Sequence, residues 1–354
     1  MGDVILAEVT RRWRSTGPTG VESVHRGSMV VADCAGNIVA LAGDDGEFFL
    51  RSSAKPFQAL AAVTSGALEH FGFGDRELAL FSASHSGEAM HVGLGRSILE
   101  RLGLDDSDLE CGVHPPLAPD AVASLYRSGG HVGPLHNNCS GKHLGMLTLA
   151  RFRGWPIAGY VERERPVQQE IFRILGSLLG RDPATIPFAT DGCGVPTARV
   201  SQREQARLFA LLANPEALPE EFRPAARRIA GAMAAHPELV AGTGRMNTHL
   251  LQAAGGAVVA KTGAEGSIGV GLRGRGLGLS VKVADGNSRP LGPVVAALLT
   301  GLGLLTDEKG AEFRARYLPA PVTNARGERV GEIRPAMRPI NALLKKLRQA
   351  GGSA

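Results

Sequence analysis

The chain has 354 residues, of which 44% are hydrophobic and 21% charged, and its formal net charge is +5. These values are ordinary for a folded globular protein and exclude a chain that is disordered over most of its length. Part of the positive charge lies in two short runs, Arg11–Arg14 and Lys345–Arg348. Aromatic residues make up only 5% and no nucleic-acid-binding motif accompanies these runs. We therefore interpret them as solvated surface and expect no nucleic-acid partner.

Apolar stretches and cysteines indicate the compartment. The longest apolar stretch, Leu291 to Leu305, is shorter than the roughly 18–20 residues that a bilayer span needs. The apolar run Val4–Ala7 is too short for a secretion signal. The four cysteines are widely spaced, which favours thiols or ligands over a disulfide framework. We expect a cytoplasmic protein with no membrane association.

The first predicted elements are strands. Residues 24–31 and 37–42 flank the turn-like cluster Asp33–Gly36, which predicts a β-hairpin. The hydrophobic period then changes, and residues 52–68 carry apolar side chains at helical spacing. Because Pro56 is tolerated only in the first turn of a helix, this helix should begin near Ser52.

The middle of the chain is predicted to be mostly helical, and strands return near its end. Thr197 is the expected N-cap of the third of four helices. From Thr306 to Pro339 the pattern is irregular, and a short basic helix is expected after it. The predicted helices are 142–152, 166–179, 197–212, 219–235 and 294–305, and the late strands are 257–261, 267–272 and 277–283.

This order of elements predicts an α/β fold of the α+β type. An antiparallel sheet is built from both chain ends with flanking helices, around a helical middle lobe. We expect one domain over residues 1–335, with a sheet lobe formed by about 1–90 and 255–335 and a helical lobe formed by about 91–254. Residues 336–354 form a basic C-terminal tail.

Two short elements indicate serine chemistry. Ser52 and Lys55 form an S-x-x-K element, and at the start of a helix these two positions lie on one face. A serine hydroxyl is a poor nucleophile until a base takes its proton, and a lysine with a lowered pKa can do so. Lys261-Thr262-Gly263 closes a predicted strand. S-x-x-K followed by K-T-G is the arrangement of serine β-lactamases and penicillin-binding proteins.

The polar cluster Ser82–Glu88 has two interpretations. It can be a serine-rich turn between two elements, with Glu88 as a capping partner. It can equally supply a second serine that Lys261 activates or holds. The sequence does not decide between them.

Two cysteines lie in polar, glycine-containing segments. Cys139 belongs to His136–His143 and Cys193 belongs to Asp191–Pro196. Their separation matches no zinc finger, so spacing alone favours two buried thiols over a metal site. Charged neighbours would nevertheless favour a thiolate. A lysine ligand would have to be neutral, so metal affinity would fall at acidic pH. Alternative ligands are His85, His91 and His143.

Together these segments resemble the Rhizobium-type, or class 3, L-asparaginase family, from about residue 5 to residue 335. The resemblance implies hydrolysis of L-asparagine to L-aspartate and ammonia, a fold similar to serine β-lactamases and glutaminases, and a homodimer. The stretches that carry it are Arg51–Gln58, Ser84–Glu88, His136–His143, Asp191–Pro196 and Lys261–Gly263.

The same resemblance implies which residues act. The family has two Ser-Lys tandems, which fall on Ser52 with Lys55 and on Ser84 with Lys261. It also has a zinc ion held by two cysteines and a lysine, which fall on Cys139, Lys142 and Cys193. The aspartate before the second cysteine falls on Asp191.

From these residues we expect Ser52 to attack the side-chain amide of asparagine and Lys55 to act as the base. Arg51, His143 and Asp191 are expected to bind the α-carboxylate and α-amino groups. Zinc is expected to position the substrate, because a serine already supplies the nucleophile. The alternatives are a β-lactamase-like, penicillin-binding or glutaminase-type serine hydrolase, and a non-catalytic zinc-binding protein on this fold.

Overall fold

The computed structural model describes residues 2–13 and 17–350, and the chain divides into two compact units. Unit 1 consists of Met1–Phe48, Ser201–Asn214 and His249–Ala354, and unit 2 of Phe49–Val200 and Pro215–Thr248. Arg14, in the first basic run, lies outside the described residues. No helix in the described ranges is long and apolar enough to cross a membrane.

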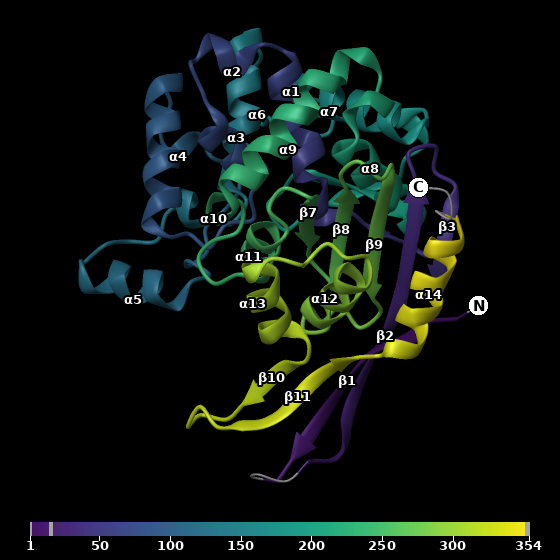
Figure 1. Ribbon diagram of the computed structural model, residues 1–354. Coiled ribbons are helices and arrows are strands. Elements are labelled where there is room, and N and C mark those ends of the chain that lie inside the picture. The colour runs from purple at the N-terminus through teal and green to yellow at the C-terminus, as the bar shows by residue number, and fades with distance from the viewer. Residues whose placement is uncertain (1, 14–16, 351–354) are drawn as a thin grey trace. The chain divides into compact units, whose positions relative to one another are not determined.

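An antiparallel sheet forms the centre of unit 1 and joins strands from both chain ends (Figure 1). Its order is β10-β11-β1-β2-β9-β8-β7, and β3 pairs with β2. The long strand β2 pairs with β1 through its first half and with β9 and β3 through its second half. The strands are β1 (Val4–Arg12), β2 (Pro18–Asp33), β3 (Ile38–Ala42), β7 (Val258–Gly263), β8 (Ser267–Leu272), β9 (Leu277–Val283), β10 (Ala320–Thr323) and β11 (Arg329–Pro335).

The predicted hairpin and the late strands are confirmed. Strands β2 and β3 pair antiparallel, and the Asp33 carboxylate accepts the Asn37 N–H at 2.8 Å to close the turn between them. Strands β8 and β9 have the predicted bounds. The sequence therefore predicted the α+β class and the contribution of both chain ends to the sheet.

Helix α8 (Gln202–Ala213) packs against β2, β8 and β9 at very short range. A Cβ on Gly278 would lie 1.9 Å from the Ala206 carbonyl oxygen, and a Cβ on Gly269 would lie 2.0 Å from the ring of Phe209. Glycine at these positions is what lets the helix rest directly on the strands.

The start of α8 corrects one prediction. Thr197 is not a helix N-cap, because Pro196–Ser201 forms strand β6 and the helix begins at Gln202. Ser201 is the N-cap: its hydroxyl accepts the Glu204 N–H at 3.2 Å, and the Glu204 carboxylate accepts the Ser201 N–H at 2.8 Å. This capping box outcompetes the weaker start signal four residues earlier.

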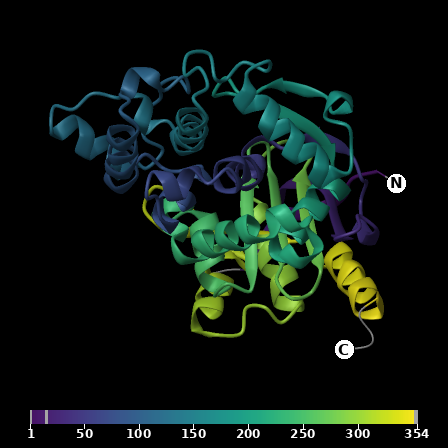
Figure 2. The same cartoon turned by 90° about the horizontal axis from the view of Figure 1, so that it is seen from above.

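The segment from Thr306 to Pro339 is also different from the prediction, because it contains α13, β10 and β11. These elements are short and have few buried apolar residues, so periodicity could not reveal them. The predicted tail includes α14, the yellow helix near the C label in Figure 2, which contacts β1, β3 and α12. The helices of this part of unit 1 are α12 (Leu291–Gly301), α13 (Glu308–Tyr317) and α14 (Met337–Ala350), the last with Ile340, Leu343, Leu344 and Leu347 buried.

Unit 2 is mostly helical, and α6 forms its centre. Every residue of α6 from Ser140 to Ala150 is buried, and α1, α3 and α4 pack around it. The helices are α1 (Lys55–Thr64), α2 (Ala67–His70), α3 (Asp75–Phe81), α4 (Ala89–Leu102), α5 (Pro119–Arg127), α6 (Ser140–Arg153), α7 (Pro166–Leu179), α9 (Arg223–Ala235) and α10 (Pro237–Val240).

Short elements complete unit 2 and the junctions between segments. Strand β4 (Glu47–Phe49) and helix α11 (Met246–Ala253) each span a point where the chain passes from one unit to the other. Strand β5 (Phe188–Thr190) pairs antiparallel with β6. The 3₁₀ helices are η1 (Arg51–Ala54), η2 (Asp106–Asp108), η3 (Pro134–His136), η4 (Pro183–Thr185), η5 (Pro215–Ala217) and η6 (Glu220–Phe222).

The units assign two segments differently from the expected lobes. Residues 49–90 were expected in the sheet lobe and belong to unit 2, whereas α8 was expected in the helical lobe and belongs to unit 1. The close packing of α8 on glycine-containing strands explains the second difference. The expectation that residues 1–335 act as one domain stays a prediction.

The glycine contacts under α8 can be tested by substitution. Gly278→Ala should lower the free energy of unfolding by about 1–3 kcal/mol, because its methyl group overlaps the Ala206 carbonyl and forces the helix away from the sheet. Gly231→Ala in α9, where no atom lies within 4 Å of the added Cβ, is the matched control and should be neutral or stabilising. Denaturant unfolding of both variants measures the difference; equal effects would contradict this packing argument.

Candidate active site

The S-x-x-K element lies in unit 2, where η1 runs directly into α1. Ser52 is half-buried, whereas the side chain of Lys55 is completely buried. Pro56 occupies the first turn of α1, as predicted. Of the predicted pair, Ser52 is therefore partly accessible to solvent and Lys55 is not.

Arg51, directly before Ser52, has a left-handed backbone with φ of 49°. A non-glycine residue in this region costs about 1–3 kcal/mol, so other contacts must stabilise it. Its N–H donates to Thr197 Oγ1 at 2.9 Å, and its guanidinium forms an ion pair with Asp191. Arg51, with its left-handed backbone fixed by Thr197 and Asp191, thus positions Ser52 just before α1.

The Lys55 ammonium contacts Ser84, not Ser52. Its Nζ donates to Ser84 Oγ at 2.9 Å and to the Asn138 carbonyl oxygen at 3.3 Å, and it also bonds to the Cys139 sulfur. The Lys55 backbone N–H donates to the Ser52 carbonyl oxygen, but within the described ranges no hydrogen bond joins the two side chains. The lysine that was expected to serve the first tandem therefore reaches the serine of the second.

Burial lowers the pKa of Lys55, and the nearby charge of Lys142 acts in the same direction. The Cys139 and Cys193 sulfurs partly oppose this shift. A lowered pKa increases the fraction of neutral amine near neutral pH, and the neutral amine is the form that can accept a proton.

Ser84 is held by a neighbouring loop of unit 2. Its backbone N–H donates to the Val240 carbonyl at 2.9 Å, and Ser86 Oγ donates to the Ala241 carbonyl at 3.0 Å. The Glu88 carboxylate accepts the N–H of Thr243 at 2.8 Å and its hydroxyl at 2.6 Å. The cluster is therefore a turn between α3 and α4, as the first interpretation has it, and its Ser84 contacts Lys55. The second interpretation, in which Lys261 activates or holds the serine, stays a prediction.

The two cysteine segments meet in unit 2. The Cys139 and Cys193 sulfurs are hydrogen-bond partners, and Lys142 Nζ lies 2.9 Å from Cys193 Sγ. Asp191 Oδ2 lies 3.8 Å from Lys142 Nζ and 3.8 Å from Cys193 Sγ. The structure therefore brings together four residues that the sequence analysis had grouped only by resemblance.

The ionisation of this cluster follows from its contacts. The Cys193 thiol donates to Cys139, which lowers the pKa of Cys139 well below its usual range and raises that of Cys193. Burial alone would lower the pKa of Lys142, but the two sulfurs and Asp191 raise it. The cluster therefore favours one thiolate beside a charged lysine.

The donor set fits a zinc ion. Two sulfurs and one nitrogen within hydrogen-bond reach match the ligand types that Zn²⁺ prefers, although a lysine must lose its proton to bind. In the described part of the chain, no group of three His, Cys, Asp and Glu side chains could hold a metal. A zinc ion here would thus require Lys142 as the third ligand, and its presence stays a prediction.

The histidines proposed as alternative ligands have other partners. His85 accepts the Gly87 N–H at 3.1 Å and bonds to Ser140 Oγ at 2.9 Å. His91 accepts the Glu88 N–H at 3.1 Å and bonds to the Glu238 carbonyl at 3.0 Å. Both rings therefore have their two nitrogens engaged and do not offer a lone pair to a metal.

His143 uses one ring nitrogen in a hydrogen bond, and its other ring nitrogen is buried. Its Nδ1 lies 2.6 Å from Tyr160 Oη, which itself accepts the Glu110 N–H at 3.1 Å. The Tyr160 O–H can therefore donate to Nδ1, which leaves the proton on Nε2. Among the described residues Nε2 has no hydrogen-bond partner, although the ring is fully buried. Burial also lowers the pKa of His143 well below its usual range, so the ring is neutral.

Lys261 lies in unit 1. It occupies β7, the last strand in the order of the sheet, and its side chain is completely buried. Its Nζ donates to the Thr262 carbonyl at 3.0 Å. Lys261-Thr262-Gly263 thus closes a strand, as predicted, whereas the pairing of Lys261 with Ser84 stays a prediction.

The sequence of the chain matches the family L-asparaginase II over residues 13–335. The chain belongs to the L-asparaginase II family. That match spans every residue of the candidate site, from Arg51 to Lys261. No curated protein matches the chain.

Several solved structures are similar to this L-asparaginase II family member. A structure of Mglu in its native form has 17% sequence identity and a TM-score of 0.45, with 79% of this chain and 65% of that chain covered. The chain thus spans less than two thirds of Mglu. A Bacillus glutaminase has 16% identity and a TM-score of 0.36, with 79% and 92% covered. A β-lactamase from Mycobacterium bovis has 16% identity and a TM-score of 0.38, with 77% and 93% covered.

Three residues of the site were missed or misassigned from the sequence. Thr197 anchors Arg51, although it was predicted as a helix cap. Asn138 contacts Lys55 through its backbone carbonyl, a role that side-chain identity cannot reveal. Tyr160 orients His143 from a segment with no motif. Only Thr197 gave a signal, because a threonine just after a glycine turn often accepts a backbone N–H.

Asp191 should stabilise the folded chain in a pH-dependent way. Burial alone would raise its pKa, but Lys142 and Arg51 lower it below the usual 3.8. Stability from a lowered carboxyl pKa is complete above the unfolded value and is lost as the pH falls through the folded value. Asp191→Asn should therefore reduce the free energy of unfolding by about 1.5–3 kcal/mol at pH 7. The difference from wild type should shrink below pH 3.8.

The measurement is denaturant unfolding of both proteins across this pH range. Asp182→Asn, which removes an exposed carboxylate that accepts the Ala184 N–H, is the control. A wild-type-to-variant difference that stays constant with pH would show that the Asp191 charge contributes nothing to stability.

Proposed function

We propose that this protein hydrolyses the side-chain amide of L-asparagine to L-aspartate and ammonia. The observation that carries the proposal is the position of Lys55. Its side chain is completely buried and its Nζ lies 2.9 Å from Ser84 Oγ. Lys55 also follows the half-buried Ser52 by one helical turn. In a chain of the L-asparaginase II family, a desolvated lysine that bonds to one serine and follows another by three residues is suited to acyl transfer from an amide.

In the proposed mechanism Ser52 Oγ attacks the amide carbon, since its partial exposure lets a substrate reach it. The serine proton passes to neutral Lys55, through Ser84 Oγ where the direct path is too long. The same proton leaves with ammonia when the C–N bond breaks. Water then takes the place of ammonia, gives one proton to Lys55 and attacks the acyl carbon. When the bond from that carbon to Ser52 Oγ breaks, Lys55 returns the proton to Ser52 Oγ and L-aspartate leaves.

Binding of the amino acid is proposed for the residues around this pair. The Arg51 guanidinium, which is 30% exposed, can bind the α-carboxylate while Asp191 holds it in place. The Nε2–H of His143 is a buried donor that a substrate oxygen could satisfy. Asp191 is a candidate acceptor for the α-ammonium group.

A zinc ion held by Cys139, Lys142 and Cys193 would supply a positive charge that positions the substrate. These residues also link the site mechanically, because Cys139 bonds to Lys55 and Lys142 lies beside Asp191. The second tandem, Ser84 with Lys261, and the homodimer are further proposals that follow from the family resemblance. The cytoplasmic location is a proposal that follows from the apolar stretches and the cysteine spacing.

The contact between Lys55 and Ser84 supports one variation on this mechanism, in which Ser84 is the nucleophile. Mass spectrometry of the enzyme quenched during turnover distinguishes the two serines, since the acylated peptide contains either Ser52 or Ser84. Hydrolysis of a β-lactam in place of asparagine would favour the β-lactamase-like alternative.

Loss of Ser52 or Lys55 should abolish most of the activity. We expect Ser52→Ala and Lys55→Ala to reduce ammonia release from L-asparagine at least about a hundredfold, because each removes a group that transfers a proton or forms the acyl bond. Ser53→Ala is the matched control: it removes a neighbouring hydroxyl that donates to the Leu50 carbonyl. Near-normal turnover by either test variant would refute the assignment.

Zinc binding should depend on pH and on both cysteines. Elemental analysis after dialysis against zinc should find one zinc per chain at pH 8 and much less at pH 6, because the raised pKa of Lys142 makes a proton compete with the metal. Cys139→Ala and Cys193→Ala should lose the metal. Cys111→Ala, which removes a buried thiol outside the cluster, should retain it. Retention of zinc by Cys193→Ala would rule out this site.

A further inference from the structure

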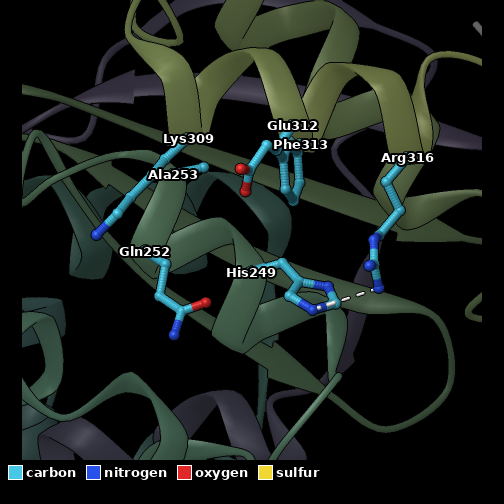
Figure 3. A pocket seen from close by; sticks show the side chains of 7 residues that line it. All are labelled: His249, Gln252, Ala253, Lys309, Glu312, Phe313 and Arg316. Atoms are coloured by element: carbon cyan, nitrogen blue, oxygen red, sulfur yellow. Dashed lines mark hydrogen bonds between the residues drawn. The ribbon is translucent and has the colours of Figure 1, made fainter.

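A separate cavity of about 450 Å³ lies within unit 1, between α13 and the second half of α11 (Figure 3). Its volume is within the range of about 300–1,000 Å³ that is typical of small-molecule sites. None of the serine, lysine or cysteine residues of the candidate active site lines it. The side chains shown in Figure 3 come from two helix faces that look toward the same space.

The lining residues follow helical spacing on both helices. His249, Gln252 and Ala253 occupy positions i, i+3 and i+4 of one face of α11. Positions i, i+3, i+4 and i+7 of one face of α13 are Lys309, Glu312, Phe313 and Arg316. Faces with this spacing usually carry apolar side chains that pack together. Here only Ala253 and Phe313 are apolar and buried, so the two faces leave an open space with polar walls.

His249 forms a neutral wall of the cavity. Arg316 donates to His249 Nε2 at 3.4 Å, and His249 Nδ1 lies 2.9 Å from Tyr317 Oη. Because Nε2 accepts, the proton lies on Nδ1 and the ring is uncharged. Burial and the neighbouring Arg316 lower the pKa of His249 in agreement with this state.

The charges of the cavity are therefore two positive and one negative. Lys309 and Arg316 lie on either side of Glu312 along α13 (Figure 3). In the described part of the chain, neither Lys309 nor Glu312 takes part in an ion pair or a side-chain hydrogen bond. The long Arg316–His249 contact is weak and can be exchanged for a stronger one.

We propose that this cavity binds a small α-amino dicarboxylic acid such as L-aspartate. Two carboxylates of the ligand pair with Lys309 and Arg316, and its ammonium group pairs with Glu312. The ligand's net charge of −1 balances the net charge of +1 on the walls. Gln252 offers an amide to a carboxylate oxygen, and the methylene of the ligand rests on Phe313.

This second site does not depend on the proposed function. If the protein is an L-asparaginase, its own product is a ligand of this class, and binding would report product concentration away from the site of chemistry. If the enzyme uses another amide, the cavity still binds the amino acid through the same three charges.

The test is calorimetric titration of the full-length protein with L-aspartate and, separately, with succinate, which has both carboxylates and no ammonium group. Arg316→Ala should lower the number of L-aspartate molecules bound per chain by one, or weaken one binding event at least about tenfold. Glu312→Gln should weaken L-aspartate in the same way and leave succinate unchanged or tighter. These results are differences between proteins, so they do not depend on whether the candidate active site also binds L-aspartate.

Glu308→Gln, on α13 outside the cavity, is the matched control and should bind both ligands as wild type does. Identical L-aspartate binding by wild type and Arg316→Ala would overturn the proposal. So would a Glu308→Gln effect as large as that of Glu312→Gln, because the charge of the helix in general would then explain the binding. Normal thermal unfolding of each variant establishes that the loss is local.

Discussion

The burial of the Lys55 ammonium group is the constraint on which the candidate site depends. An ammonium group removed from water must find hydrogen-bond acceptors or lose its proton, and this one has a serine hydroxyl, a backbone carbonyl and a sulfur around it. These acceptors come from two parts of unit 2: Ser84 lies in the loop after α3, and Asn138 and Cys139 lie in the turn that leads into α6. Lys55 thus contacts two segments that are far apart in the sequence, one with Ser84 and one with Asn138 and Cys139.

Close backbone packing brings those segments within reach. Gly141, the second residue of α6, would place a Cβ 2.1 Å from the Leu80 carbonyl oxygen, so α6 touches the end of α3 directly. The loop after α3 carries Ser84, and the start of α6 carries Cys139 and Lys142. The same contact therefore sets the distance between the serine and the cysteine cluster. A glycine that looks unremarkable in the sequence determines the spacing of two reactive groups.

Much of the fold could be predicted from the sequence because strong patterns specify it. The strands 267–272 and 277–283 and the helix 166–179 were predicted to the residue, since each has a clear hydrophobic period and turn residues at its ends. The elements between Thr306 and Pro339 were missed because they rest on other parts of the sheet and bury little of their own. The hydrophobic pattern places the start of this helix at Thr197, whereas the capping box of Ser201 and Glu204 starts α8 at Gln202.

The site shows the same division. Residue types and motifs pointed to Ser52, Lys55 and the two cysteines as candidates, because the reactivity of these residues comes from their side chains and can be read from residue type. The partner of Lys55 could not be predicted, since an i, i+3 relation places Ser52 on the same helix face but cannot say which way a long lysine turns. The strained backbone at Arg51 gave no signal either, because the sequence does not reveal φ for a residue other than glycine or proline.

The assembly of unit 1 from three separate chain segments has a consequence during synthesis. Strand β2 emerges from the ribosome early, but its neighbour β9 follows only about 240 residues later. At the usual elongation rate of about 5–20 residues per second, the hairpin of β2 and β3 waits roughly 10–50 s with one edge unpaired. Unit 2 is largely complete during that interval, and the apolar edge needs protection from other nascent chains until the last strands arrive.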